Sequence, residues 1–239
     1  MARKKAENEA PRPITVADHQ ELNRKNNKQN RSAVNDALKF PQGEQFDQDL
    51  TEILEGDSEE KGETVVIALI DCDCFMAVNK EFGSEEGDRF LIETGKFIEK
   101  NAPKNASVYR IGGDEFGLIF KGDMEREEIF LFLNDLRNNY DVSTPDGRKH
   151  TITIGMATAF VDASRCAELI RKADGALFRA KAGGGNRVIM AREEKMIPKT
   201  SHYTQDQLLR LNKLATREGI GEAILLREAL DMLLKKYDV

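Results

Sequence analysis

Residues 64–70 form the stretch that most restricts the possible folds of this chain. They read Thr-Val-Val-Ile-Ala-Leu-Ile, an uninterrupted apolar run of strand length. Such a run is typical of a strand buried on both faces of a sheet, because a strand with one solvated face alternates apolar and polar side chains. The run therefore predicts a central strand in a sheet on which helices pack.

Acidic residues follow this run directly, since residues 71–73 are Asp-Cys-Asp. A second acidic pair lies further along, where two short apolar runs, 108–111 and 116–120, flank the sequence Gly-Gly-Asp-Glu at 112–115. Two β-prone runs joined by a glycine-containing turn predict a β-hairpin, because glycine reaches positive φ angles without a steric penalty. The hairpin would carry two carboxylates at its tip.

Carboxylates at the end of a central strand, opposite a hairpin that carries two more, predict an oxygen-ligand site for Mg²⁺. Magnesium keeps water and substrate phosphates in its coordination shell, so a few protein carboxylates suffice. The alternative is that the turn acids are simply solvated, as turn acids usually are. A zinc site is disfavoured: Cys72-x-Cys74 is a single cysteine pair, zinc sites usually need two such pairs or partnering histidines, and the three histidines are scattered.

Residues 112–116, Gly-Gly-Asp-Glu-Phe, resemble the signature of the GGDEF domains, the diguanylate cyclases. The resemblance extends over roughly residues 62 to 190. Further matching segments follow in the family's order and spacing at 71–75, 79, 82–83, 87–88, 110, 153–155 and 173–181. The resemblance implies an α/β (α+β) fold, with a palm-like nucleotide-cyclase sheet flanked by helices.

The same resemblance implies an activity, the condensation of two GTP into cyclic di-GMP with release of two pyrophosphates. The enzyme would act as a dimer with two Mg²⁺ (or Mn²⁺) ions per active site. Its metal ligands would be Asp71, the backbone carbonyl of Cys72, Asp114 and Glu115, and its catalytic acids Asp114 and Glu115. Two such ions can stabilise both the attacking and the leaving oxygen of the reaction.

The resemblance also assigns substrate-binding residues. Asn79 and Asp88 match the pair that reads guanine, and a carboxylate at this position accepts from N–H groups that adenine lacks in that pattern. Lys181 matches the lysine that neutralises the β- and γ-phosphates. The remaining matching positions are the amides of Cys74 and Phe75 around the phosphates, Gly112 and Gly113 in the signature turn, and Arg110.

Three positions depart from the family pattern, and two of them, 76 and 185, remove positive charge from around the triphosphate. Met76 stands where lysine is usual, Lys80 where aspartate is usual, and Gly185 where a phosphate-binding arginine is common. We therefore expect weaker GTP affinity with the chemistry intact. The alternative reading is a nucleotide-binding, DNA-associated regulator whose GGDEF domain is weak or inactive.

Three parts are expected along the chain: a polar arm over residues 1–30, a GGDEF domain over 31–191, and a small unit over 199–239. The last part has a capping-box start at Thr204, a helix with Leu208, Leu211 and Leu214 expected to point inward, and a second helix over 222–236. It resembles a ribbon-helix-helix domain. Such a unit is an intertwined dimer, so we expect homodimerisation through 199–239. DNA binding is the second possibility, since strand alternation would turn Ser201 and Tyr203 toward the core and leave Thr200 and His202 exposed to read a major groove.

The remaining apolar periodicities predict further helices and strands, and the composition of the chain bears on its location. Helices are expected at 46–54, between 71 and 82, and at 86–100, 125–138 and 164–182, with strands at 151–159 and 187–190. No apolar run reaches the roughly 20 residues that span a bilayer. The start of the chain shows no apolar signal core and three cysteines give no disulfide framework, so a cytoplasmic location without a membrane partner is expected.

Overall fold

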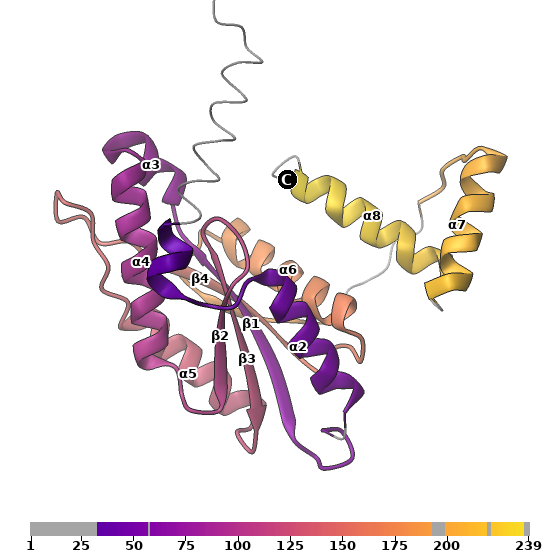
Figure 1. Cartoon of the computed structure of the whole chain (residues 1–239), viewed down its shortest axis with the longest axis horizontal. Coiled ribbons are helices and arrows are strands. Elements are labelled where there is room, and N and C mark those ends of the chain that lie inside the picture. Colours follow the sequence, from indigo (N-terminus) through magenta and orange to yellow (C-terminus); the bar gives the residue numbers. More distant parts are fainter. Residues whose placement is uncertain (1–32, 57, 193–198, 219–220, 237–239) are drawn as a thin grey trace, which may run out of the picture. The chain divides into compact units, whose positions relative to one another are not determined.

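The computed structural model describes residues 33–56, 58–192, 199–218 and 221–236 (Figure 1). The chain divides into two compact units, Met1–Arg192 and Glu193–Val239, and each is described by itself. The arm predicted over residues 1–30 lies outside the described residues. Within the described ranges, no helix has both the length and the apolar character needed to cross a bilayer.

The first unit is built on a five-stranded sheet in the order β2-β3-β1-β4-β5, and it confirms the predicted α/β palm-like fold. β1 pairs antiparallel with β3 and β4, while β4 and β5 are parallel. Residues 33–38 are helical ahead of these elements. The elements are α2 (Gly43–Glu55), β1 (Thr64–Cys72), α3 (Phe75–Phe82), α4 (Ser84–Asn101), β2 (Ala106–Arg110), β3 (Glu115–Gly122), α5 (Arg126–Asn138), β4 (Ile152–Thr158), α6 (Cys166–Ala182) and β5 (Val188–Met190).

The central strand β1 is buried on both faces, as its apolar run predicts. Val66, Ala68 and Ile70 pack with residues of α4 and α5, whereas the odd-numbered residues of the strand pack with α2 and α6. Helices therefore cover both faces of the sheet (Figure 1). Because side chains alternate along a strand, the parity of a β1 residue decides which helices it meets.

Helix α6 lies unusually close to the sheet at Gly155 of β4. A Cβ added at Gly155 would stand 2.3 Å from both the carbonyl oxygen of Ala173 and the amide nitrogen of Leu177. The motif glycine is thus required by close packing of backbone on backbone. This contact sets the height of α6 over the end of β1.

The β2–β3 hairpin is confirmed, but the predicted reason for its two glycines is wrong. Gly112 and Gly113 do not have positive φ angles in the structure. A Cβ at Gly112 would instead lie 3.0 Å from a carboxylate oxygen of Glu115, and a Cβ at Gly113 would meet open space. Gly112 therefore allows the turn to lie close to the Glu115 side chain, and the space beside Gly113 stays open.

The second unit contains α7 (Gln205–Glu218) and α8 (Glu222–Lys236). The predicted capping box is confirmed, because the Gln207 amide donates to the Thr204 hydroxyl at 3.2 Å and the Thr204 amide donates to the Gln207 side chain at 3.0 Å. The leucines predicted to point inward are not covered in the single chain, since Leu208 and Leu214 are exposed. Residues 199–204 belong to no strand.

Candidate functional site

The acidic centre lies where β1 leaves the sheet. β1 continues two residues beyond its apolar run, so Asp71 is a ladder residue that pairs directly with Glu115 on β3. Side chains that face each other across an antiparallel pair lie on the same face, with Cβ atoms about 5 Å apart. Two like charges at this spacing repel each other unless a cation lies between or beside them.

Lys181 of α6 supplies that positive charge in the structure. Its Nζ atom lies 2.6 Å from a carboxylate oxygen of Asp71. Asp71 has an odd position on β1, so it faces α6, and its side chain is only 7% exposed. The centre therefore combines a buried carboxylate, a neighbouring acid and a lysine reaching from the helix above.

The ionisation of this centre reflects its burial. Desolvation raises the pKa of Asp71 to about 7, although the hydrogen bond and charge of Lys181 oppose the rise. The charges of Asp114 and Glu115 raise it further. Partial burial acts to lower the pKa of Lys181, but the hydrogen bond to Asp71 and the three carboxylate charges outweigh it, so this pKa lies above its ordinary value.

The donors available to a cation are few but suit magnesium. Among the described residues no three His, Cys, Asp or Glu side chains gather in a group that could hold a metal ion. Asp71 and the signature acids lie around one strand end, where the amide of Cys72 also donates to the carbonyl of Asp114 at 3.3 Å. A site with one or two carboxylates, completed by substrate phosphates and water, is the kind that Mg²⁺ uses.

Asp73 does not face this centre. Its two carboxylate oxygens accept hydrogen bonds of 2.6 Å from the hydroxyls of Thr151 and Thr153, and one also accepts from the amide of Asn186 at 3.1 Å. Asp73 thus joins the end of β1 to the entry of β4 and to the loop after α6. The sequence reasoning missed Thr151 as its partner, because no spacing signal connects two residues so far apart.

The start of α3 lies next to this junction. Cys74 precedes the helix in the left-handed region with φ +62°, and Phe75 is the first helical residue. N–H groups in the first turn of a helix have no partner within it, and they favour an anion. The predicted phosphate-binding amides of Cys74 and Phe75 are therefore at a helix start.

The predicted guanine-reading residues lie on adjacent helices, Asn79 on α3 and Asp88 on α4, and both side chains are partly exposed. The helices approach closely, because a Cβ at Gly87 would stand 1.9 Å from the Asn79 side-chain oxygen. Burial raises the pKa of Asp88 above its ordinary value, and the charge of Arg110 opposes this shift.

Arg110, one of the predicted substrate-binding residues, also has partners within the chain. The residue is 4% exposed, and its guanidinium donates to the Asn35 side chain at 2.7 Å and to the carbonyl of Gly113 at 2.9 Å. It therefore holds the signature turn from below. The role of Asn35 was not predicted from the sequence, where it is one polar residue in a short helix.

Two departures from the family pattern lie at the edge of the site. Met76, on the first turn of α3, is 76% exposed. Gly185 has a φ angle of +69°, and a Cβ there would lie 2.9 Å from an oxygen of Asp73. The loop after α6 is thus shaped for glycine.

Thr200 and His202, the predicted DNA-contacting residues, are both exposed. Ser201 and Tyr203 were predicted to face a core but are exposed as well, so the expected alternation is absent from the single chain. In a ribbon-helix-helix dimer, the inward side chains of such a strand would be buried against the second copy of the chain.

Comparison with known proteins identifies relatives of this chain. The family model described as "Diguanylate cyclase, GGDEF domain" matches residues 36–187. Diguanylate cyclase A of Treponema denticola is 31% identical over 140 residues, which are 56% of this chain and 37% of that protein. The probable diguanylate cyclase DgcT of Escherichia coli is 30% identical over 130 residues, 52% of this chain and 28% of that protein. The chain therefore spans about a third of the length of these relatives.

Solved structures share the fold. The GGDEF domain of PA1120 from Pseudomonas aeruginosa superposes with a TM-score of 0.61 at 24% identity, covering 66% of this chain and 99% of that domain. The coiled coil and GGDEF domain of DgcB from Caulobacter crescentus, in complex with c-di-GMP, gives a TM-score of 0.59 at 23% identity, covering 74% and 97%. At these identities the likeness shows the fold alone.

Proposed function

Because this chain belongs to the GGDEF diguanylate cyclase family, we propose that it is itself a cyclase that condenses two GTP into cyclic di-GMP and releases two pyrophosphates. The observation that carries the proposal is the arrangement at the end of β1, where Asp71 faces Glu115 across the sheet and Lys181 lies 2.6 Å from Asp71. We assign the activity to residues 31–191.

Divalent cations fit this centre. Two Mg²⁺ or Mn²⁺ ions would be held by Asp71, the carbonyl of Cys72, Asp114 and Glu115. When bound they supply Lewis-acid stabilisation of the charge on the reacting oxygens. The low exposure of Asp71 supports this role, because burial strengthens electrostatic interactions with a developing charge.

The remaining residues bind and orient the triphosphate. Lys181 neutralises the β- and γ-phosphates from the α6 side, and the helix start at Cys74 and Phe75 offers N–H donors to the same group. Gly113 leaves open space above the signature turn for the nucleotide. Arg110 keeps that turn in place through the Gly113 carbonyl.

Asn79 and Asp88 select guanine in this proposal. The partly buried carboxylate of Asp88 accepts from guanine N1–H and N2–H₂, and adenine does not offer that pair of donors. A site built around such an acceptor rejects a base that leaves it unpaired. GTP is therefore the substrate proposed over ATP.

Cyclisation needs two such domains face to face, and the second unit is proposed to supply the pairing. Large apolar side chains remain uncovered on its two helices, among them Leu209, Leu230, Met232 and Leu233, with exposed fractions from 50% to 68%. Exposed apolar surface of this kind marks an interaction site. We propose that residues 199–239 form a ribbon-helix-helix-like homodimer.

Incubating the full-length protein with Mg²⁺ and GTP, followed by mass identification of the products, tests the function. The expected products are cyclic di-GMP and pyrophosphate, with none formed from ATP. Binding of GTP without any product would favour the regulatory alternative instead, which the exposed Met76 and the missing arginine at Gly185 support.

Metal affinity is expected to rise with pH through about 7. The folded protein keeps a proton on Asp71 up to about pH 7, whereas the unfolded chain loses it near 3.8, so the metal-free fold loses stability as the pH rises between these values. The proton must leave before the oxygen can coordinate a cation. Calorimetric titration of Mn²⁺ between about pH 6 and about pH 8 measures this; affinity independent of pH would contradict the assignment of Asp71.

A further inference from the structure

A hairpin between α5 and β4 touches three parts of the nucleotide site without belonging to it. Residues 142–151 fold back on themselves through an antiparallel bridge between Ser143 and Lys149. The Thr144 amide donates to the carbonyl of Arg148 at 3.0 Å, and Gly147 turns the chain with a φ angle of +81°. The segment is therefore a hairpin with hydrogen bonds of its own and not an irregular loop.

The hairpin reaches α3 through one arginine. Arg148 donates to both carboxylate oxygens of Glu81, at 2.8 and 3.1 Å, and its guanidinium lies 5.8 Å from the ring centre of Phe82. Asp146 at the hairpin tip accepts two hydrogen bonds from the same guanidinium, at 2.6 and 3.1 Å. The bidentate pairing with Glu81 fixes direction as well as distance.

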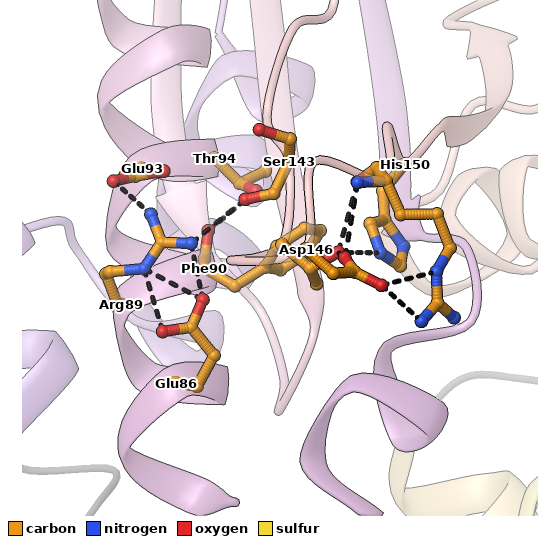
Figure 2. Close-up of polar contacts among 10 residues, drawn as sticks. Glu86, Arg89, Phe90, Glu93, Thr94, Ser143, Asp146 and His150 are labelled. Atoms are coloured by element: carbon orange, nitrogen blue, oxygen red, sulfur yellow. Dashed lines mark hydrogen bonds and ion pairs between the residues drawn. The ribbon is translucent and has the colours of Figure 1, made fainter. Parts of the chain in front are cut away.

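The hairpin also reaches α4. Figure 2 shows Arg89 extending from α4 toward Ser143, with Glu86 and Glu93 on either side of its guanidinium. Arg89 donates to the carbonyl of Ser143 at 2.9 Å. The His150 ring packs edge-on against Phe90 of the same helix, with ring centres 5.1 Å apart.

A third contact joins the hairpin to the end of β1. The amide of Asp73 donates to the carbonyl of Thr151 at 3.0 Å, in addition to the hydroxyl contact described above. One short segment is thus bonded to the helix that carries Asn79, to the helix that carries Asp88, and to the loop that leads to Cys74.

Between the hairpin and α3 lies a cavity of about 280 Å³. Its walls include Ala77, Val78 and Phe82 from the helix and Lys149 and His150 from the hairpin. Apolar packing is therefore incomplete here, and Arg148 spans the gap. A helix of eight residues such as α3 has little stability of its own and depends on tertiary contacts.

We propose that residues 142–151 act as a clamp that fixes the separation of α3 and α4, with Arg148 as a positioning residue for guanine recognition. The inference rests on the proposed function, since it concerns the same base pocket. In the described part of the chain, Arg148 forms ion pairs with Glu81 and Asp146, and neither is a predicted substrate-binding residue. It orients Asn79 through the last turn of α3, and binding residues must be held within a fraction of an ångström to act.

The test compares Arg148→Met with the full-length protein in two measurements. Hydrogen exchange at the α3 amides, without nucleotide, is expected to quicken because the last turn loses its anchor. The dissociation constant of a non-hydrolysable GTP analogue, measured by calorimetry, is expected to rise about threefold to fivefold, the range of a well-oriented exposed ion pair. In turnover, KM is expected to rise by a similar factor while kcat stays within about twofold.

Lys149→Met is the matched control. It removes a positive charge from the same hairpin, but Lys149 pairs with Asp141 at 2.7 Å and makes no ion pair with α3 in the described residues. This variant is expected to match the unaltered protein in both measurements. Arg148→Lys keeps the charge without the bidentate geometry and is expected to fall between the two.

Unchanged α3 exchange in a folded Arg148→Met protein would overturn the clamp, as would equal changes in α3 exchange in Arg148→Met and Lys149→Met. These outcomes do not depend on nucleotide. Failure of every form to bind the GTP analogue would refute the proposed function, and the exchange measurement would still decide whether the hairpin holds α3.

Discussion

Asp71→Asn is expected to abolish cyclic di-GMP synthesis, lowering the rate by at least about 10³-fold. The amide keeps the shape of the carboxylate but cannot neutralise a divalent cation. Asp71 is also the buried member of the acidic centre and the partner of Lys181, so exposed acids cannot substitute for it. The measurement is product formation at saturating Mg²⁺ and GTP.

Asp123→Asn is the control for this prediction. Asp123 is exposed and follows the end of β3 opposite the signature turn, so the same chemical change far from the site should leave the rate unaltered. Thermal unfolding would separate lost chemistry from lost structure. Substantial activity in Asp71→Asn would remove the carboxylate from the mechanism and with it the proposed metal site.

Removing residues 192–239 is expected to lower the specific activity about 100-fold at nanomolar protein. If the second unit pairs two copies, it holds the attached cyclase domains at an effective concentration on the order of millimolar. A protein ending at Ala191 would then depend on chance encounters. Its rate per molecule should rise with protein concentration, whereas that of the full chain should stay constant.

A point substitution in the full-length protein tests dimerisation through the second unit without a deletion. Leu233→Glu places a charge on the uncovered apolar surface of α8, where Leu233 is 50% exposed. Leu131→Glu makes the same change on α5, where Leu131 is 63% exposed, and serves as the control. In analytical ultracentrifugation, Leu233→Glu is expected to sediment as a monomer and Leu131→Glu as a dimer. A dimer in both proteins, or equal activity of the shortened and full chains at nanomolar concentration, would contradict pairing through the second unit.

The sequence predicted the helices and strands well because the signals for them are local. The apolar run at 64–70 identified β1 and its burial on both faces, and the capping box at Thr204 identified the start of α7. The ends of helices were predicted less accurately, because α6 begins at Cys166 and the sequence predicted a start at Ser164. These signals depend on neighbours a few residues apart, which a sequence displays directly.

The parts that the sequence could not predict depend on distant partners. That Asp73 is held by Thr151 and Thr153 follows from the position of β4 beside β1, and hydroxyls are too common to indicate this. Arg110 matched a functional motif, yet its partners Asn35 and Gly113 place it under the signature turn. A motif identifies which residues matter, whereas the three-dimensional contacts decide what each one does.

The loop after α6 has a consequence for any attempt to convert this protein to the family consensus. Replacing Gly185 by arginine would put a side chain on a backbone with φ +69°, at a cost on the order of 1 kcal/mol. Its Cβ would also press on the carboxylate that ties β1 to β4. We therefore expect that replacing Gly185 alone will not restore the phosphate-binding arginine of the family. The whole loop after α6 would have to be exchanged, so that the backbone at this position suits a larger side chain.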